Sequence, residues 1–244
     1  MPHLIHLDAR LSLAYELYDS CDLAADIGTD HAHLPAALLQ RGRCQYMILT
    51  DISGNALQNA RNEIIRFNLS KRVAFRTGDG LMPLNEECGM ISVTGMGGRT
   101  IHDILLCGRE KLRGASLILS AHTDLPLIRE AIAAIGYHAE REEPCYSAGR
   151  WYLVIRARPG IRKMSPREIR LGGPLFDGEP ERLIPYIIHR RKILQNKLLG
   201  MLSAKEPNRT EISLLRDDMD YYSTAISKMS SSERSKKHDS SESV

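Results

Sequence analysis

The sequence predicts an α/β protein with a parallel, doubly wound sheet followed by an antiparallel pair of helices. Three observations support this fold class. Strand-like apolar runs alternate with helix-like segments between residues 23 and 135. Two further strand-like runs, at 137–143 and 151–156, flank a turn-like segment at 144–149. Past residue 160, breaker-rich connectors lead into two long segments with helical spacing. Alternating strands and helices are typical of a parallel sheet, to which the terminal hairpin adds an antiparallel strand.

The elements follow one another in a regular order. Apolar residues recur at helical spacing within 8–20, so this first segment is predicted to be a helix. We then expect strands at 23–27, 46–50, 73–76, 90–94 and 117–120, with helices at 34–40, 54–67, 100–106 and 125–135.

The chain is expected to divide into a sheet domain at 1–160, a helical hairpin domain at 161–230 and a disordered tail at 231–244. The first hairpin helix is predicted at 181–202 and carries several basic side chains. The second has apolar residues in steps of three and four, which predicts a coiled-coil-like seam: Ile212, Leu215, Met219, Tyr222, Ile226 and Met229. Serine and charged residues dominate the tail.

Composition limits the classes of function. A formal charge of +3 permits binding to nucleic acid but does not by itself indicate it. The five cysteines are scattered without a C-x-x-C pair, which disfavours a zinc site and fits a reducing compartment. Since no apolar stretch approaches the length of a membrane span, we expect a cytoplasmic protein that binds neither membrane nor metal. The oligomeric state stays open, with a monomer favoured.

The segment from Ala25 to Pro35 has the outline of a strand, a tight turn and a helix at a nucleotide site. One glycine stands where the dinucleotide fingerprint needs three, so the pattern indicates a nucleoside ligand such as S-adenosylmethionine. Gly28 allows close approach of the backbone, and Asp26 is suited to accept a hydrogen bond from the cofactor's amino group. The alternative is an ordinary turn that caps a helix.

Polar residues also follow the later strands. Asp51 comes 25 positions after Asp26 and is suited to bind ribose hydroxyls, the alternative being a helix N-cap. Asp79 is suited to the cofactor's adenine amino group, the alternative being a D-G turn. The glycine cluster at 95–98 indicates a special backbone path beside the transferred methyl group, rather than a flexible loop. The expected cofactor residues are Asp26, Gly28, Asp51, Ile52, Asp79, Gly80, Gly95, Met96 and Gly97.

Three motifs, at 25–35, 78–81 and 95–98, together resemble those of bacterial tRNA (adenine-22)-N1-methyltransferases. The resemblance extends over roughly residues 4 to 230. It implies a class I, Rossmann-like AdoMet methyltransferase sheet with a C-terminal coiled-coil-like domain, S-adenosylmethionine as the methyl donor and tRNA as the partner. After the fifth strand the family has an amide-containing pattern, whereas this chain has Ser120, Ala121 and His122.

The chemistry of this expected reaction predicts catalytic roles for Asp30 and His31. The N1 atom of neutral adenine carries a lone pair, so its methylation needs no general base and depends largely on positioning. Asp30 is expected to accept a hydrogen bond from the adenine amino group and to face the developing positive charge, while His31 is expected either to orient Asp30 or to stack near the base.

The target base must leave its stack, and the tRNA needs a docking surface. The residues expected to contact tRNA are Arg10, Gly98, His122, Arg190, Arg191, Lys192 and Lys197. The basic residues would otherwise form a solvated helix face. Two other functions stay open, namely methyl transfer to another RNA or a small molecule, and tRNA binding without catalysis.

Overall fold

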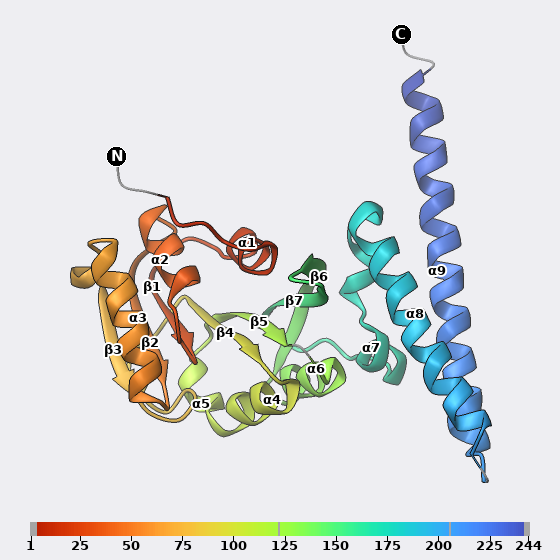
Figure 1. The fold of residues 1–244 in the computed structure, drawn as a ribbon, viewed down its shortest axis with the longest axis horizontal. Coiled ribbons are helices and arrows are strands. Elements are labelled where there is room, and N and C mark those ends of the chain that lie inside the picture. Colours follow the sequence, from red (N-terminus) through yellow and green to blue (C-terminus); the bar gives the residue numbers. More distant parts are fainter. Residues whose placement is uncertain (1–3, 122, 205, 242–244) are drawn as a thin grey trace. The chain divides into compact units, whose positions relative to one another are not determined.

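The computed structural model describes residues 4–121, 123–204 and 206–241, with side chains up to residue 231. The chain forms two compact units, of which the first ends at Pro174 and the second begins at Leu175. The first unit holds the sheet, and the second holds two long helices (Figure 1).

The sheet unit interleaves strands and helices in the predicted order. Its strands are β1 (Cys21–Ile27), β2 (Cys44–Asp51), β3 (Val73–Thr77), β4 (Met90–Met96), β5 (Ser116–Ala121), β6 (Tyr137–Ser147) and β7 (Arg150–Pro159). Its helices are α1 (Ala9–Glu16), α2 (His33–Gln40), α3 (Gly54–Arg66), η1 (Ser70–Arg72), α4 (Gly98–Cys107), α5 (Arg109–Leu112), α6 (Leu125–Ala134) and α7 (Pro166–Leu171).

Seven strands in the described residues form one sheet with the order β3-β2-β1-β4-β5-β7-β6. The strands from β1 to β5 pair in parallel, and β7 pairs antiparallel with both β5 and β6. The predicted doubly wound sheet with a terminal antiparallel hairpin is therefore confirmed. The winding changes direction between β1 and β4, which is where ligands bind in open α/β sheets.

The hairpin turn is shorter than the predicted segment at 144–149. Strand β6 continues to Ser147, and only Ala148 and Gly149 make the turn, with φ angles of 48° and 78°. Two consecutive positive φ angles are typical of the type I′ turn that joins twisted strands. The pairing of the Tyr146 and Trp151 rings, 5.3 Å apart, extends the hairpin past the predicted strand end.

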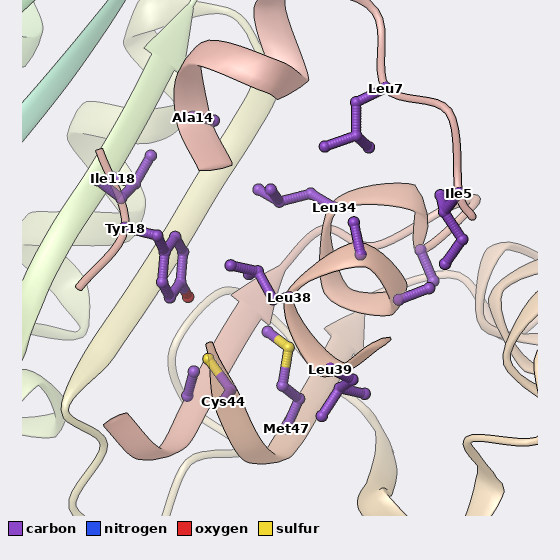
Figure 2. Packing of buried hydrophobic residues seen from close by; sticks show 14 of the residues in the cluster. Ile5, Leu7, Ala14, Tyr18, Leu34, Leu38, Leu39, Cys44, Met47 and Ile118 are labelled. Atoms are coloured by element: carbon purple, nitrogen blue, oxygen red, sulfur yellow. The ribbon is translucent and has the colours of Figure 1, made fainter. Parts of the chain in front are cut away.

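Helices α1, α2 and α3 share one buried apolar cluster, whereas α4 and α6 pack together at another side of the sheet (Figure 1). Leu34 and Leu38 of α2 belong to this cluster together with Tyr18 and Met47 (Figure 2). Helix α2 is apolar on nearly all sides because it is enclosed by α1, α3 and the sheet. The cluster also includes Ala24, in the middle of β1.

Helix α7 belongs to the first unit, so the structure ends this unit at Pro174 rather than at residue 160. The cause is an ion pair inside the unit. Arg129 of α6 donates to the Glu142 carboxylate at 2.7 and 2.9 Å, and both side chains are essentially inaccessible to solvent. The same guanidinium donates to the carbonyl of Ile169, 3.1 Å away, and thereby holds α7 against α6.

The second unit contains η2 (Pro174–Asp177) from Leu175 onward, α8 (Pro180–Leu202) and α9 (Arg209–Ser241). Helices α8 and α9 pack against each other as the predicted hairpin. Of the predicted seam residues, Ile212, Leu215 and Tyr222 are buried, whereas Met219, Ile226 and Met229 are half-buried. Helix α9 continues to Ser241, although the sequence predicts disorder from residue 231. The apolar seam ends at Met229, so the sequence offers no core position to signal this extension.

Candidate active site

A pocket of about 220 Å³ lies where β1 and β4 end and α2 begins. Its lining residues come from the start of α1, the β1–α2 turn and the end of β4. They include Arg10, Asp26, Gly28, Asp30, His31 and Gly95. Six predicted site residues, from three separate parts of the sequence, therefore line one pocket.

Asp26 is held by two hydroxyl groups at the end of β1. The Ser92 hydroxyl donates to Oδ1 at 2.5 Å, and the Thr29 hydroxyl donates to Oδ2 at 2.6 Å. Burial raises the pKa of the Asp26 carboxyl above its usual value, while the two hydrogen bonds and the charge of Arg10 oppose this shift. The carboxylate is thus rigid and buried, and the site beside it favours a positively charged ligand group.

Gly28 adopts a left-handed backbone conformation and leaves room for the Met96 side chain, and a residue with a Cβ atom would be strained and would clash there. Its φ is +75°, and a Cβ atom at this position would lie 1.8 Å from Cε of Met96. The loop after β4 therefore approaches the β1–α2 turn closely, and the glycine makes this approach possible.

Arg10 contributes a cation to the pocket. Asp8 caps α1 by accepting a hydrogen bond from the Leu11 backbone at 2.8 Å, which sets Arg10 in the first turn. The guanidinium lies over the Tyr152 ring, 5.6 Å from its centroid. Its Nη1 atom is buried and makes no hydrogen bond within the described residues. Because an unsatisfied buried N–H is costly, this atom points to a ligand that accepts hydrogen bonds.

Asp30 is exposed to solvent and lines the edge of the pocket. Its Oδ1 atom accepts a hydrogen bond from Asn59 of α3 at 3.1 Å, and Oδ2 lies 3.3 Å from Nε2 of His31. The rings of His31 and His33 stack with centroids 5.8 Å apart. The Asp30 carboxylate thus lies beside the His31 ring, and the catalytic roles of both residues stay predictions.

The remaining predicted cofactor residues lie at or just after the ends of β2, β3 and β4, the edge of the parallel strands at which the 220 Å³ pocket also lies. Asp51 accepts a hydrogen bond from the Ser53 backbone at 2.7 Å, and Ser53, not Asp51, caps α3. Ile52 is 73% exposed, which is unusual for a large apolar side chain. Asp79 is exposed in the turn after β3, and the Gly80 carbonyl accepts a hydrogen bond from Thr50.

The predicted tRNA residues divide into separate groups. Arg10 lies in the pocket, as described above, and Gly98 is buried against the loop that follows β5. A Cβ atom at Gly98 would lie 2.5 Å from the Thr123 carbonyl oxygen, which gives Gly98 a packing role. His122 lies outside the described residues.

The basic residues of α8 also differ from one another. Lys197 forms an ion pair with Glu211 of α9 at 2.7 Å. In the described part of the chain, Arg191 and Lys192 are exposed and Arg190 is half-buried.

Sequence reasoning missed Ser92, Thr29 and Asn59. Ser92 is paired with Asp26 across β1 and β4, so the register of the strands was needed to find it. Asn59 reaches Asp30 from a helix 29 positions further along the chain. Thr29 stands inside the 25–35 motif, and its place three residues after Asp26 was the available signal.

The described residues contain no group of three or more histidine, cysteine or acidic side chains arranged to hold a metal ion. None of the helices searched in that part of the chain is long and apolar enough to cross a membrane.

Comparisons with known proteins agree with this geometry. Residues 7–155 match the methyltransferase domain family. A tRNA (adenine(22)-N(1))-methyltransferase from Bacillus subtilis (strain 168) is 30% identical over 176 residues, which cover 71% of this chain and 74% of the relative.

Solved structures show the same fold. The Bacillus subtilis M1A22 tRNA methyltransferase TrmK is 26% identical, with a TM-score of 0.80, over 91% of this chain and 99% of that one. Sp1610 of Streptococcus pneumoniae, in complex with S-adenosyl-L-methionine, is 24% identical, with a TM-score of 0.79. The match covers 91% of this chain and 100% of that one. The chain therefore belongs to the methyltransferase domain family and, within it, to the family of tRNA (adenine(22)-N(1))-methyltransferases.

Proposed function

We propose that this protein transfers the methyl group of S-adenosylmethionine to N1 of adenine 22 in tRNA. One observation carries the proposal. The pocket places the buried carboxylate of Asp26 near Nη1 of Arg10, which has no hydrogen-bond partner in the described part of the chain. An anion and a cation in one pocket complement a ligand with an ammonium and a carboxylate, as at the amino-acid end of the cofactor.

The surrounding residues fit the rest of the cofactor. Asp26 would accept hydrogen bonds from the ammonium group, and Arg10 would donate to the carboxylate. Oδ1 of Asp51 is engaged by Ser53, and the carboxylate is suited to the ribose hydroxyls. Ile52 offers an exposed apolar surface to a planar base, and Asp79 is suited to that base's amino group. Gly80, Gly95, Met96 and Gly97 form the backbone around this ligand.

When bound, S-adenosylmethionine supplies a methyl group on a positively charged sulfur. The protein's task is to hold the acceptor nitrogen in line with that methyl group, since N1 of adenine has no proton to lose. Asp30, fixed by Asn59, would accept a hydrogen bond from the adenine amino group. Its negative charge would stabilise the positive charge that adenine gains as the N1–carbon bond forms. His31 would orient the second carboxylate oxygen.

The helical unit supplies the docking surface in this proposal. Arg190, Arg191 and Lys192 form a short basic run on α8, suited to the phosphates of a folded RNA. Lys197 contributes less because Glu211 neutralises it. Action on tRNA places the protein in the cytoplasm.

The test combines the protein with labelled S-adenosylmethionine and two transcripts, an unmodified tRNA and the same tRNA with guanine at position 22. We expect 1-methyladenosine in the first transcript and no label in the second. Label at another position, or on a small molecule only, would identify a methyltransferase with a different acceptor. Binding of both ligands without transfer would identify a tRNA-binding protein without catalysis. Either result would refute the proposal.

A further inference from the structure

Two cysteines face each other at the amino-terminal end of the parallel strands. Cys21 begins β1, Cys44 begins β2, and the two residues are direct partners in the parallel pairing. Their sulfur atoms are 3.6 Å apart. Neighbouring strands lie about 4.8 Å apart, which is inside the range of about 4.4–6.8 Å between Cα atoms that a disulfide spans. Joining the sulfurs therefore requires no change of strand register.

The two thiols differ in access and in acidity. Cys21 is half-buried, whereas Cys44 is fully buried in the cluster with Tyr18 and Met47 (Figure 2). The hydrogen bond from the Cys44 thiol lowers the pKa of Cys21, although burial opposes this shift. The same contact, together with burial, raises the pKa of Cys44. Because thiolates are the nucleophilic form, Cys21 is the sulfur that reacts first.

Cys88 and Cys107 differ from this pair. Burial raises the pKa of Cys88 to about 11, which keeps this thiol protonated at neutral pH. Cys107 is exposed near the end of α4 and serves as a single-thiol comparison. The sulfur–sulfur contact that we describe is therefore the one between Cys21 and Cys44.

We propose that Cys21 and Cys44 are a modification site, which hydrogen peroxide converts into a reversible intramolecular disulfide. In the first step the Cys21 sulfur attacks one peroxide oxygen, the O–O bond breaks, and a sulfenic acid and one water form. In the second step the Cys44 sulfur attacks the sulfenic sulfur, the S–S bond forms, and the hydroxyl leaves as a second water with the Cys44 proton. The thiols lose two electrons, and the peroxide is reduced to two waters.

The experiment treats the full chain, carrying Cys107→Ser to prevent links between molecules, with hydrogen peroxide. The remaining thiols are then alkylated, and tryptic peptides are identified without reduction. Trypsin separates the two cysteines because Arg41 and Arg43 lie between them. We expect a Cys21–Cys44 linked peptide pair, a mass loss of two hydrogens, and full recovery of both thiols with dithiothreitol.

Two variants separate the chemistry from loss of fold. Cys21→Ser, at a half-buried position, is expected to melt like the parent and to form no linked peptide. Cys44→Ala is expected to accumulate the Cys21 sulfenic acid, trapped by dimedone, because the resolving thiol is gone. The proposal fails if Cys21 and Cys44 stay fully alkylatable at a peroxide dose that oxidises Cys107 in the unmodified chain. It also fails if Cys21 links to Cys88 instead.

Discussion

At the residue scale, the buried carboxylate of Asp26 destabilises the folded protein when it is ionised, and it is suited to bind a ligand ammonium group. Its folded-state pKa is raised from 3.8, so the folded apoprotein holds the Asp26 proton more tightly than the unfolded chain does. This group therefore favours folding at pH values below about 3.8, and that contribution is lost as pH rises through the raised pKa. A ligand ammonium group would offset the remaining cost of the buried charge.

The Asp26→Asn variant tests this account. The difference in unfolding free energy, wild type minus variant, should fall as pH rises above 3.8, by at most about 1.4 kcal/mol per pH unit. Urea unfolding of the apoprotein at a series of pH values measures it. At neutral pH the variant should also bind S-adenosylmethionine about tenfold to a hundredfold more weakly, measured by calorimetry. A difference that does not vary with pH would contradict the raised pKa.

Arg10 was predicted from the sequence to contact tRNA, whereas its place in the pocket favours a contact with the cofactor. Its Nη1 atom is buried and makes no hydrogen bond to the residues that the structure describes, which favours a ligand carboxylate inside the pocket over a phosphate on the surface. Arg10→Ala should weaken S-adenosylhomocysteine binding about tenfold or more, because a charge-assisted hydrogen bond is lost. Binding of methylthioadenosine, which lacks the amino-acid end, should stay within about twofold. Equal losses for both ligands, or a loss confined to tRNA binding, would contradict this assignment.

At the scale of elements, α3 sets the position of the predicted catalytic carboxylate. Asn59 donates to Asp30 across 29 residues of sequence, whereas Asn62 on the same helix contacts only Gln58 among the hydrogen bonds we describe. Asn59→Ala should lower kcat about tenfold and leave the affinity for S-adenosylmethionine unchanged. Asn62→Ala is the matched control and should retain the parent kcat. Steady-state methylation of tRNA measures both, and equal kcat values for the two variants would rule out this positioning role.

The ion pair between α6 and β6 determines where the first unit ends. Arg129→Met leaves the Glu142 carboxylate buried without its partner, and it also releases the Ile169 carbonyl of α7. Breaking a buried pair in this way should cost about 3–5 kcal/mol of unfolding free energy. The double variant Arg129→Met with Glu142→Leu should recover part of that loss. Urea unfolding measures the series, and a single variant as stable as the wild type would contradict this role.

The same elements show what the sequence was able to predict. The strands and helix α8 were predicted to within a few residues because apolar periodicity reports directly on burial, whereas α9 continues past its last apolar seam position. The end of the first unit was not predicted, because it depends on the contacts of Arg129 with Glu142 and Ile169. A basic residue in a helix is normally exposed, so no pattern in the sequence indicated this buried pair. In the pocket, Asp26 and Gly28 were visible as a local motif, whereas Ser92 needed the register of β1 and β4.

At the scale of the whole molecule, the proposed function divides the work between a pocket in the sheet unit and a charged surface on the helical unit. Net charge does not reveal this division, since the chain carries 33 basic and 30 acidic residues. The local pairing of the charges is more informative. Lys197 is neutralised by Glu211, while Arg191 and Lys192 are exposed on α8 in the described residues. Cationic side chains without an acidic partner displace counterions from RNA. Arg191 and Lys192 should therefore contribute more strongly to salt-dependent binding than Lys197.

The exposed Arg191 and Lys192 and the ion-paired Lys197 should therefore differ in their effect on tRNA binding. Replacing Arg191 and Lys192 with Gln should weaken tRNA binding and reduce the slope of log K against log salt by roughly 0.7–0.9 for each phosphate that the variant no longer neutralises. Lys197→Gln is the control of the same charge change per residue, and it should leave the slope nearly unaltered because Glu211 already neutralises Lys197. Filter binding at several salt concentrations gives the slopes, and S-adenosylmethionine affinity should be the same in all three proteins. Equal slopes for the double variant and the wild type would mean that α8 presents a solvated face and that tRNA docks elsewhere.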